Sequence, residues 1–206
     1  MFKRVVVVTD LSPAAYTLLN CLGGLNALGA EKCLLMQCMS FPQASSVALS
    51  YSTTLIDRCL HEQSTILENH GFQVETRIIT GVAKNEINRT AEREKYSLIV
   101  AGAQVCSLTS ELFFGGLVYD LIHHASKPVL IIRLEEDELK KQACFKATGC
   151  HLSHHVLFPT DFSENADHAF SYVSDLAAAG VEKIKINLAA CPGPVPDHAS
   201  PDPPTG

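Results

Sequence analysis

Two short stretches of the chain place an aspartate between a strand-like run and a helix-like run. The first, Thr9-Asp10-Leu11-Ser12, follows four valines, and the second, Thr160-Asp161-Phe162-Ser163, repeats it 151 positions later. Such an aspartate can close an Asx-type turn on its own backbone. It can also contact a ligand, because open parallel sheets bind ligands beyond the carboxyl ends of their strands. Both roles are open for Asp10 on this evidence.

The elements that would position Asp10 alternate between strands and helices. The β-branched run 5–8 predicts a strand buried on both faces, and Ser12 with Pro13 predicts the first turn of a helix that ends at Gly29. Hydrophobic patterns predict further strands at 33–39, 72–79, 98–101 and 129–132, and helices at 55–71, about 87–91 and 112–125. This alternation predicts an α/β fold, a doubly wound domain of five parallel strands in residues 1–134.

Residues 154–190 repeat the beginning of the chain in register and without a gap. The apolar helical face 15–25 corresponds to 166–176, and the stretch 29–32 corresponds to 180–183. We predict an internal duplication whose second copy is a partial β-α-β unit, truncated after its second strand and joined by a charged linker at 135–153. The tail 191–206, with six prolines in sixteen residues, is predicted to be disordered. Half a sheet cannot cover its own hydrophobic faces, so we expect this unit to pack on the first domain, exchange with another chain or stay loose.

Three stretches together resemble the universal stress protein family across residues 1–134. They are the turn at 9–12 with its copy, the run TGVAKNEINRTAEREKYSLIVAGA at 80–103, and the run ELFFGGLVYDLIHHASKPVLII at 111–132. The resemblance implies a sheet of order 3-2-1-4-5 and a homodimer formed through the last strand of the first domain. It also implies ATP binding in one of the two branches of the family, and a tandem arrangement of which the second copy here is cut short.

In the ATP branch, a pattern of three glycines follows the fourth strand. Two residues separate the first glycine from the second, nine residues separate the second from the third, and a Ser or Thr comes directly after the third. Such glycines let backbone N–H groups approach phosphates at the start of a helix. Gly102 and Gly115 stand at the first and third glycine positions, whereas Val105 replaces the second glycine and Gly116 replaces the hydroxyl. The resemblance thus implies a degenerate site for ATP or AMP, built from Thr9, Asp10, Gly102, Gln104, Gly115 and Gly116. The glycines also have a plain interpretation, as a tight turn and a helix start.

Charge, hydropathy and cysteine spacing bear on partners and compartment. The net charge is −6 and the basic residues are scattered, so we expect no nucleic-acid partner. The apolar runs are far shorter than the ~20 residues that span a membrane, and no secretory cleavage site follows Met1, which predicts a cytoplasmic protein. Most of the eight cysteines are expected to be reduced. Cys144, Cys150, His151, His154 and His155 fit no tetrahedral spacing, so no metal site is predicted.

Catalytic signatures do not emerge from the sequence. We find no GxxxxGK[ST] or GxSxG motif, no GxGxxG after the first strand, and no acid and base that can be paired, so no enzyme is predicted. The leading interpretation is a cytoplasmic stress-response regulator that binds an adenine nucleotide. One alternative is an interaction module without nucleotide, whose exposed sheet edge at 129–132 recruits a partner. The other alternative is a weak ATP hydrolase.

Overall fold

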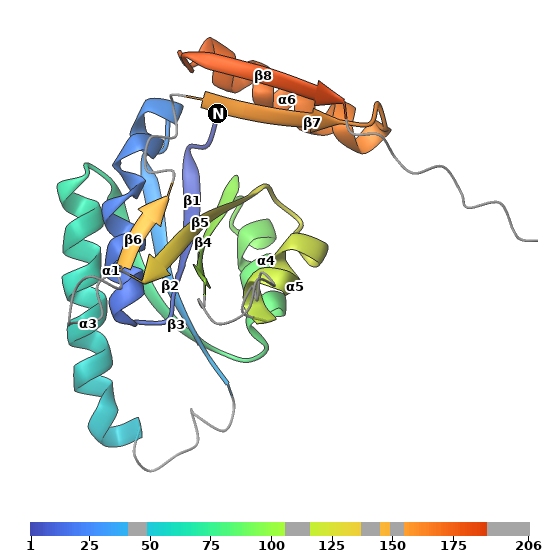
Figure 1. Ribbon diagram of the computed structural model, residues 1–206. Helices are drawn as coiled ribbons and strands as arrows, with labels where there is room; N and C mark the ends of the chain where they lie inside the picture. Colours follow the sequence, from blue (N-terminus) through green and yellow to red (C-terminus); the bar gives the residue numbers. More distant parts are fainter. Residues whose placement is uncertain (41–48, 106–115, 137–144, 149–154, 189–206) are drawn as a thin grey trace, which may run out of the picture. The chain divides into compact units, whose positions relative to one another are not determined.

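A computed structural model describes residues 1–40, 49–105, 116–136, 145–148 and 155–188 (Figure 1). The chain divides into two compact units, Met1–Ser153 and His154–Gly206. Each unit is described by itself below.

The first unit is built on a sheet of order β3-β2-β1-β4-β5-β6, whose first five strands are parallel. The expected order 3-2-1-4-5 is therefore confirmed. These strands are β1 (Arg4–Thr9), β2 (Lys32–Met39), β3 (Gln73–Thr80), β4 (Leu98–Val105) and β5 (Val129–Glu136). The helices are α1 (Pro13–Asn20), the 3-10 helix η1 (Leu22–Leu28), α3 (Leu49–Asn69), α4 (Ala83–Arg93) and α5 (Gly116–His124). Figure 1 shows α1 and α3 on one side of the sheet and α4 and α5 on the other.

The centre of the sheet is its most apolar part. Val5, Val6 and Val7 of β1 are at most 1% exposed, because β2 and β4 flank this strand and helices cover both of its faces. The core beneath α4 and α5 joins Val6 and Leu34 of the sheet to Ile87 of α4 and Leu121 of α5. The continuous β-branched run thus forms a strand buried on both faces, as its sequence predicts.

Two elements differ from their sequence predictions in extent. The predicted helix from Pro13 to Gly29 is divided into α1 and the 3-10 helix η1, where Gly23 and Gly24 lower the helix propensity. Gly29 closes η1 in the left-handed region, at φ 86°. The predicted linker 135–153 is partly a strand: β5 continues to Glu136, and β6 (Phe145–Thr148) pairs antiparallel with Arg133–Glu136. Backbone hydrogen bonds to the neighbouring strands stabilise this polar end of β5. Its sequence lacks the hydrophobic pattern by which a strand is predicted.

The second unit contains the predicted partial β-α-β arrangement. It consists of β7 (His155–Thr160), α6 (Glu164–Ala178) and β8 (Lys183–Leu188), and the two strands pair in parallel. Phe158 of β7 is buried and packs on Phe170 of α6, with ring centroids 5.6 Å apart. Leu157, which corresponds to the fully buried Val6 of the first copy, is 59% exposed. The face of β7 away from α6 therefore carries an exposed leucine.

Several features outside the sheet also bear on the sequence predictions. Within the described ranges, no helix has the length and apolar character needed to cross a membrane. Cys33, Cys38 and Cys59 are free thiols, whereas Cys21 is disulfide-bonded. The tail 191–206 and the Cys144–His154 part of the cysteine and histidine group also lie outside the described residues.

Candidate functional site

A pocket of about 500 Å³ lies at the carboxyl ends of β1 and β4. The crossover from β1 leads to β2 and the crossover from β4 leads to β5, so this is the point where the strand order reverses and where such sheets bind ligands. The described lining comes from β1 and the following turn (Val8, Thr9, Asp10), the start of α1 (Ser12, Ala14, Ala15, Leu18), β4 (Ala101, Gly102), the start of α5 (Gly116, Leu117, Val118) and β5 (Leu134).

Four of the six predicted site residues meet at this pocket. Thr9, Asp10, Gly102 and Gly116 all line it, although the two glycines are about a hundred positions away from Thr9 and Asp10 in sequence. Gln104 lies on β4, but its side chain is not described, and Gly115 lies outside the described residues. Val105 is the last residue of β4, and Cys106 also lies outside the described part.

The turn after β1 is fixed by two side-chain hydrogen bonds. The Leu11 N–H donates to Thr9 Oγ1 at 3.0 Å, and the Ser12 N–H donates to Asp10 Oδ1 at 2.9 Å, while Leu11 adopts φ 61°. The Asx-type turn considered for Asp10 is thus present. Asp10 is exposed, and its Oδ2 has no hydrogen bond among the described residues. One carboxylate oxygen closes the turn and the other remains available to a ligand.

The hydroxyl proton of Thr9 is used inside the protein. The hydroxyl donates to Oε1 of Gln63 at 2.7 Å, in addition to accepting from Leu11. Gln63 lies on α3 with no exposed surface, and its Nε2 has no partner among the described residues. Thr9 therefore contributes to the site through the shape of the turn, which a buried carboxamide supports from behind.

Gln63 was not identified from the sequence, although a signal for it exists. It stands on the helical stripe formed by Cys59, Leu60 and Leu67, where an apolar residue is expected. Leu60 and Leu67 are buried in α3. A polar residue on such a stripe needs a buried partner, and here the partner is Thr9.

Ser12 supplies a second available polar group. It is the N-cap residue of α1 with extended backbone (φ −71°, ψ 164°), but its side chain makes no capping bond. Its Oγ is buried and has no hydrogen-bond partner among the described residues. In the second copy, Ser163 Oγ accepts from the Ala166 N–H at 3.2 Å. The hydroxyl that caps a helix in one copy is therefore left free beside the pocket in the other.

Gly102 has a packing reason for being a glycine. It lies within β4, which extends three residues past it, and it pairs with Ile132 of β5. A Cβ at this position would come 2.8 Å from Leu134 Cδ1 and 3.5 Å from Leu18 Cδ2. At Gly116, by contrast, an added Cβ would meet nothing within 4 Å. The first glycine makes room for core side chains at the base of the pocket, and the second begins a helix.

The second copy repeats the turn almost atom for atom. The Phe162 N–H donates to Thr160 Oγ1 at 3.1 Å, the Ser163 N–H donates to Asp161 Oδ1 at 2.9 Å, and Phe162 adopts φ 59°. Among the described residues, β7 pairs only with β8, so this turn faces no counterpart of β4. Turn closure alone accounts for the repeated aspartate, and the pocket belongs to the first copy.

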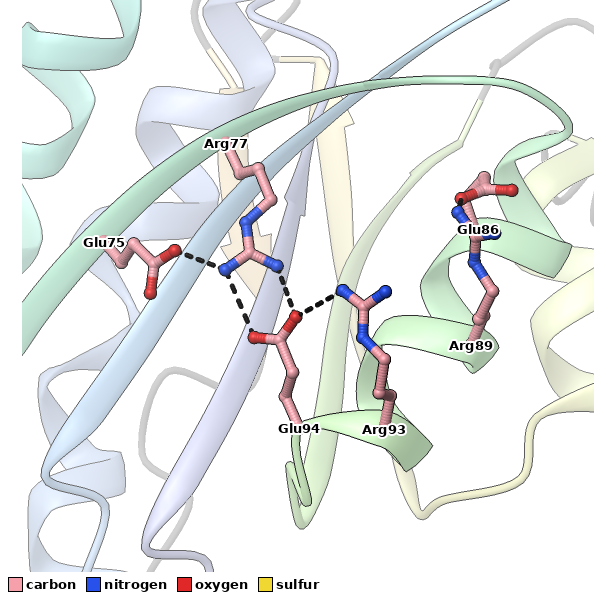
Figure 2. A network of polar contacts seen from close by, with 6 residues as sticks. All are labelled: Glu75, Arg77, Glu86, Arg89, Arg93 and Glu94. Atoms are coloured by element: carbon pink, nitrogen blue, oxygen red, sulfur yellow. Dashed lines mark hydrogen bonds and ion pairs between the residues drawn. The ribbon is translucent and has the colours of Figure 1, made fainter.

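A network of ion pairs lies elsewhere, between the edge strand β3 and the residue that follows α4 (Figure 2). Arg77 Nη1 and Nη2 donate to the two carboxylate oxygens of Glu94 at 2.6 and 3.1 Å, and Arg93 Nη2 donates to Oε1 of Glu94 at 2.8 Å. Arg77 also pairs with Glu75. The hydrogen bonds from Arg77 and then Arg93 lower the pKa of Glu94 to about 2. None of these side chains lines the pocket, so the network has a structural role.

The free thiols of β2 are poor nucleophiles. Burial raises the pKa of Cys33 to about 12. Burial, followed by the charge of Glu86, raises the pKa of Cys38 to about 11. Since the thiolate is the reactive form, both cysteines act as small apolar side chains at neutral pH.

Comparison with known proteins identifies the family of the chain and agrees with the arrangement of its sheet. The sequence model of a family described as "Universal stress protein family" matches residues 1–133. The chain belongs to the universal stress protein family. A universal stress protein of Methanocaldococcus jannaschii is 24% identical over 155 residues, which cover 65% of this chain and 96% of that protein.

Solved structures of this family share the fold. A universal stress protein from Archaeoglobus fulgidus superposes with a TM-score of 0.73 at 20% identity, covering 94% of this chain and 69% of that one. A universal stress protein in complex with cAMP superposes with a TM-score of 0.51 at 21% identity, covering 64% of this chain and 97% of that one. At these identities the likeness concerns the arrangement of the sheet and its helices.

Proposed function

We propose that this universal stress protein is a cytoplasmic stress-response regulator that binds an adenine nucleotide in the pocket between β1 and β4. The single observation that carries the proposal is the meeting of the Asp10 turn with Gly102 and the start of α5 at the point where the strand order reverses. A protein of the same fold was crystallised with cAMP, an adenine nucleotide. The proposal is for regulation by binding, without turnover.

The pocket offers separate surfaces for the parts of such a ligand. Its apolar walls, among them Val8, Ala15 and Val118, suit the faces of a purine ring. Asp10 Oδ2 and Ser12 Oγ suit the hydroxyl or amino hydrogens of the nucleoside. The departures from the ATP-branch pattern, at Val105 and Gly116, fall on the phosphate side of the site.

Isothermal titration calorimetry of the whole chain with AMP and with ATP tests this proposal. We expect saturable binding of at least one of them in the millimolar range or tighter, and weaker binding to the Ser12→Ala variant. The Ser171→Ala variant is the matched control, because it removes a serine hydroxyl from α6 of the second copy. An absence of heat at millimolar nucleotide, with a folded circular dichroism spectrum, would refute nucleotide binding.

Turnover is tested separately. Prolonged incubation of the chain with ATP and Mg²⁺ is expected to release phosphate at the rate of a blank without protein. A release rate that scales with protein concentration and is lost in a pocket variant would make the chain a hydrolase instead.

A second candidate function, a homodimeric interaction module, rests on the outer edge of β5. Strand β6 pairs with β5 only from Arg133 onward, so no described strand covers the outer edge of residues 129–132. Exposed strand edges pair readily with other strands. We expect sedimentation velocity to show a dimer whose amide hydrogen exchange at 129–132 slows as concentration rises. A monomer at all concentrations would contradict this candidate.

A further inference from the structure

We propose that Gln63 of α3 is a positioning residue of the pocket, which holds the Asp10 turn in its binding geometry through Thr9. This inference rests on the proposed function, since it concerns the same pocket. It goes beyond that function because Gln63 is not among the residues that line the pocket. The affinity for a ligand then depends on a side chain behind the binding surface.

Thr9 connects the pocket to α3 through a single oxygen atom. Thr9 lines the pocket, and its Oγ1 accepts from the Leu11 N–H at 3.0 Å and donates to Gln63 Oε1 at 2.7 Å. Thr9 and Gln63 are both buried. A hydrogen bond in such surroundings cannot be exchanged for one to water, so its loss leaves unsatisfied polar groups. The rotamer of Thr9, and with it the acceptor for the Leu11 N–H, therefore depends on Gln63.

The turn that Thr9 holds has a strained backbone. Leu11 adopts φ 61°, in the left-handed region that disfavours a leucine, and such a conformation persists only where neighbouring contacts fix it. Leu11 stands between Asp10 and Ser12, whose Oδ2 and Oγ are the polar groups proposed to contact the nucleoside. When Thr9 turns away, the Leu11 N–H loses its acceptor, and relaxation of Leu11 moves both groups. A ligand that contacts both groups thus binds best while the bond between Thr9 and Gln63 is intact.

The second copy shows that closing the turn does not require this bond. There the Phe162 N–H donates to Thr160 Oγ1 and Phe162 adopts φ 59°, but Thr160 donates no hydrogen bond among the described residues. The bond to Gln63 is therefore an addition, found in the copy whose turn lines the pocket. It fixes the turn relative to α3, a role that turn closure alone does not supply.

A second hydrogen bond joins the same segment of the chain to α3. The hydroxyl of Tyr16, on α1, donates to Oε2 of Glu62 at 3.0 Å, and this bond is exposed. Water readily replaces an exposed hydrogen bond, whereas the buried bond between Thr9 and Gln63 has no such substitute. The positioning role therefore belongs to Gln63, and Tyr16→Phe provides a comparison for it.

The first test is calorimetry of the whole chain with AMP and with ATP, at a temperature at which circular dichroism shows every variant folded. Gln63→Leu removes the acceptor for Thr9 and should weaken binding at least about fivefold, the low end of couplings between two sites. Tyr16→Phe and Ser64→Ala, which removes another buried hydroxyl of α3, should stay within about twofold.

The outcomes of this test separate the inference from the proposed function. Binding by Gln63→Leu within about twofold of the unchanged chain would overturn the inference and leave the proposed function standing. A larger loss in Tyr16→Phe than in Gln63→Leu would also overturn it. No binding of either nucleotide by the folded, unchanged chain would overturn both.

A conservative variant separates positioning from stability. Gln63→Glu keeps an acceptor oxygen for Thr9 but buries a carboxyl group, so it should be less stable than the unchanged chain in urea unfolding. It should nevertheless recover most of the affinity that Gln63→Leu loses. If affinity instead follows stability, with Gln63→Glu binding no better than Gln63→Leu, Gln63 has a structural role alone and the inference is wrong.

Amide hydrogen exchange of α3 provides a readout on the unchanged chain. Ligand binding and the local opening of α3 are reciprocally coupled, so saturating nucleotide should slow exchange around residue 63 at least about fivefold. The slowing should persist in Ser64→Ala and be absent in Gln63→Leu. Exchange of α3 that bound nucleotide leaves unchanged, or that slows equally in Gln63→Leu, would contradict the inference.

Discussion

The hydrogen bond between Thr9 and Gln63 ties the turn beside the pocket to α3, and its removal should follow a defined energetic pattern. Thr9 is 4% exposed and Gln63 is fully buried, so either residue left alone keeps a buried polar group without a partner. We expect Gln63→Leu to lower the free energy of unfolding by about 1 kcal/mol, because it strands the Thr9 hydroxyl but also removes Nε2, which has no partner among the described residues.

Replacing both partners should cost less than the sum of the two single changes. Thr9→Val strands the Gln63 carboxamide at a similar cost, and it also removes the acceptor for the Leu11 N–H, worth roughly 1 kcal/mol more. In the double variant the carboxamide and the hydroxyl are both gone, so mainly the Leu11 bond is missed. The expected coupling energy is about 1–2 kcal/mol.

Urea unfolding followed by circular dichroism measures these differences. Ser64→Ala is the matched control, because Ser64 is a buried polar residue of the same helix whose hydroxyl donates to the His61 carbonyl at 2.9 Å and does not contact Thr9. Its effect should add to that of Thr9→Val within about 0.5 kcal/mol. If the effects of Gln63→Leu and Thr9→Val on the free energy of unfolding also add within about 0.5 kcal/mol, the reasoning is refuted. Two residues that share a buried hydrogen bond cannot be energetically independent.

The remaining predictions concern pH and the glycines. The pKa of Glu94 is lowered to about 2 in the folded protein, so its contribution to stability is complete above the unfolded pKa of 4.5 and is lost as the pH falls toward 2. Acid unfolding of Glu94→Gln should lack this part of the pH dependence. An acid unfolding profile equal to that of the unchanged protein would contradict the ion pair with Arg77. Gly102→Ala should destabilise the protein by about 1–3 kcal/mol through its contact with Leu134. Gly116→Ala places a methyl group in open space at the start of a helix, so it should be neutral or stabilise the protein by up to about 1 kcal/mol. Urea unfolding measures both variants. Equal losses of stability in Gly102→Ala and Gly116→Ala would refute the argument from the packing of Leu134.

A strand that its own sequence pattern specifies can be predicted from the sequence. A strand that depends on pairing with neighbouring strands cannot be predicted in this way. The run 5–8 is β-branched throughout and forms β1 nearly as expected. The last four residues of β5, Arg133–Glu136, carry three charged side chains and no hydrophobic alternation. They are strand because β6 pairs with all four of them and β4 pairs with the first three. That information is non-local, so the composition of Glu135 and Glu136 predicts a linker instead.

At the pocket, the residue types could be predicted from the sequence, and the structure adds the reasons for them. The repeated turn at the end of a predicted strand points to Asp10, and the family resemblance points to Gly102 and Gly116. All three residues line the pocket. The resemblance assigned Gly102 to phosphate approach, whereas the structure adds that Leu134 and Leu18 occupy the space beside it. No pattern of spacing predicts which distant leucine fills the gap beside a glycine, because that depends on the packing of β5 and α1.

The duplicated turn separates what a turn does from what a site requires. Both copies have the same two turn-closing hydrogen bonds and nearly the same positive φ, so a threonine, an aspartate and a serine form the turn in both places. In the first copy the described residues of β4 and α5 line a pocket together with the turn, and Ser12 leaves its hydroxyl uncapped. The aspartate is therefore conserved between the copies by the geometry of the backbone, and binding depends on the strand beside it. If this is right, the matched changes Asp10→Asn and Asp161→Asn should be alike in their effect on the turn and differ in their effect on ligands.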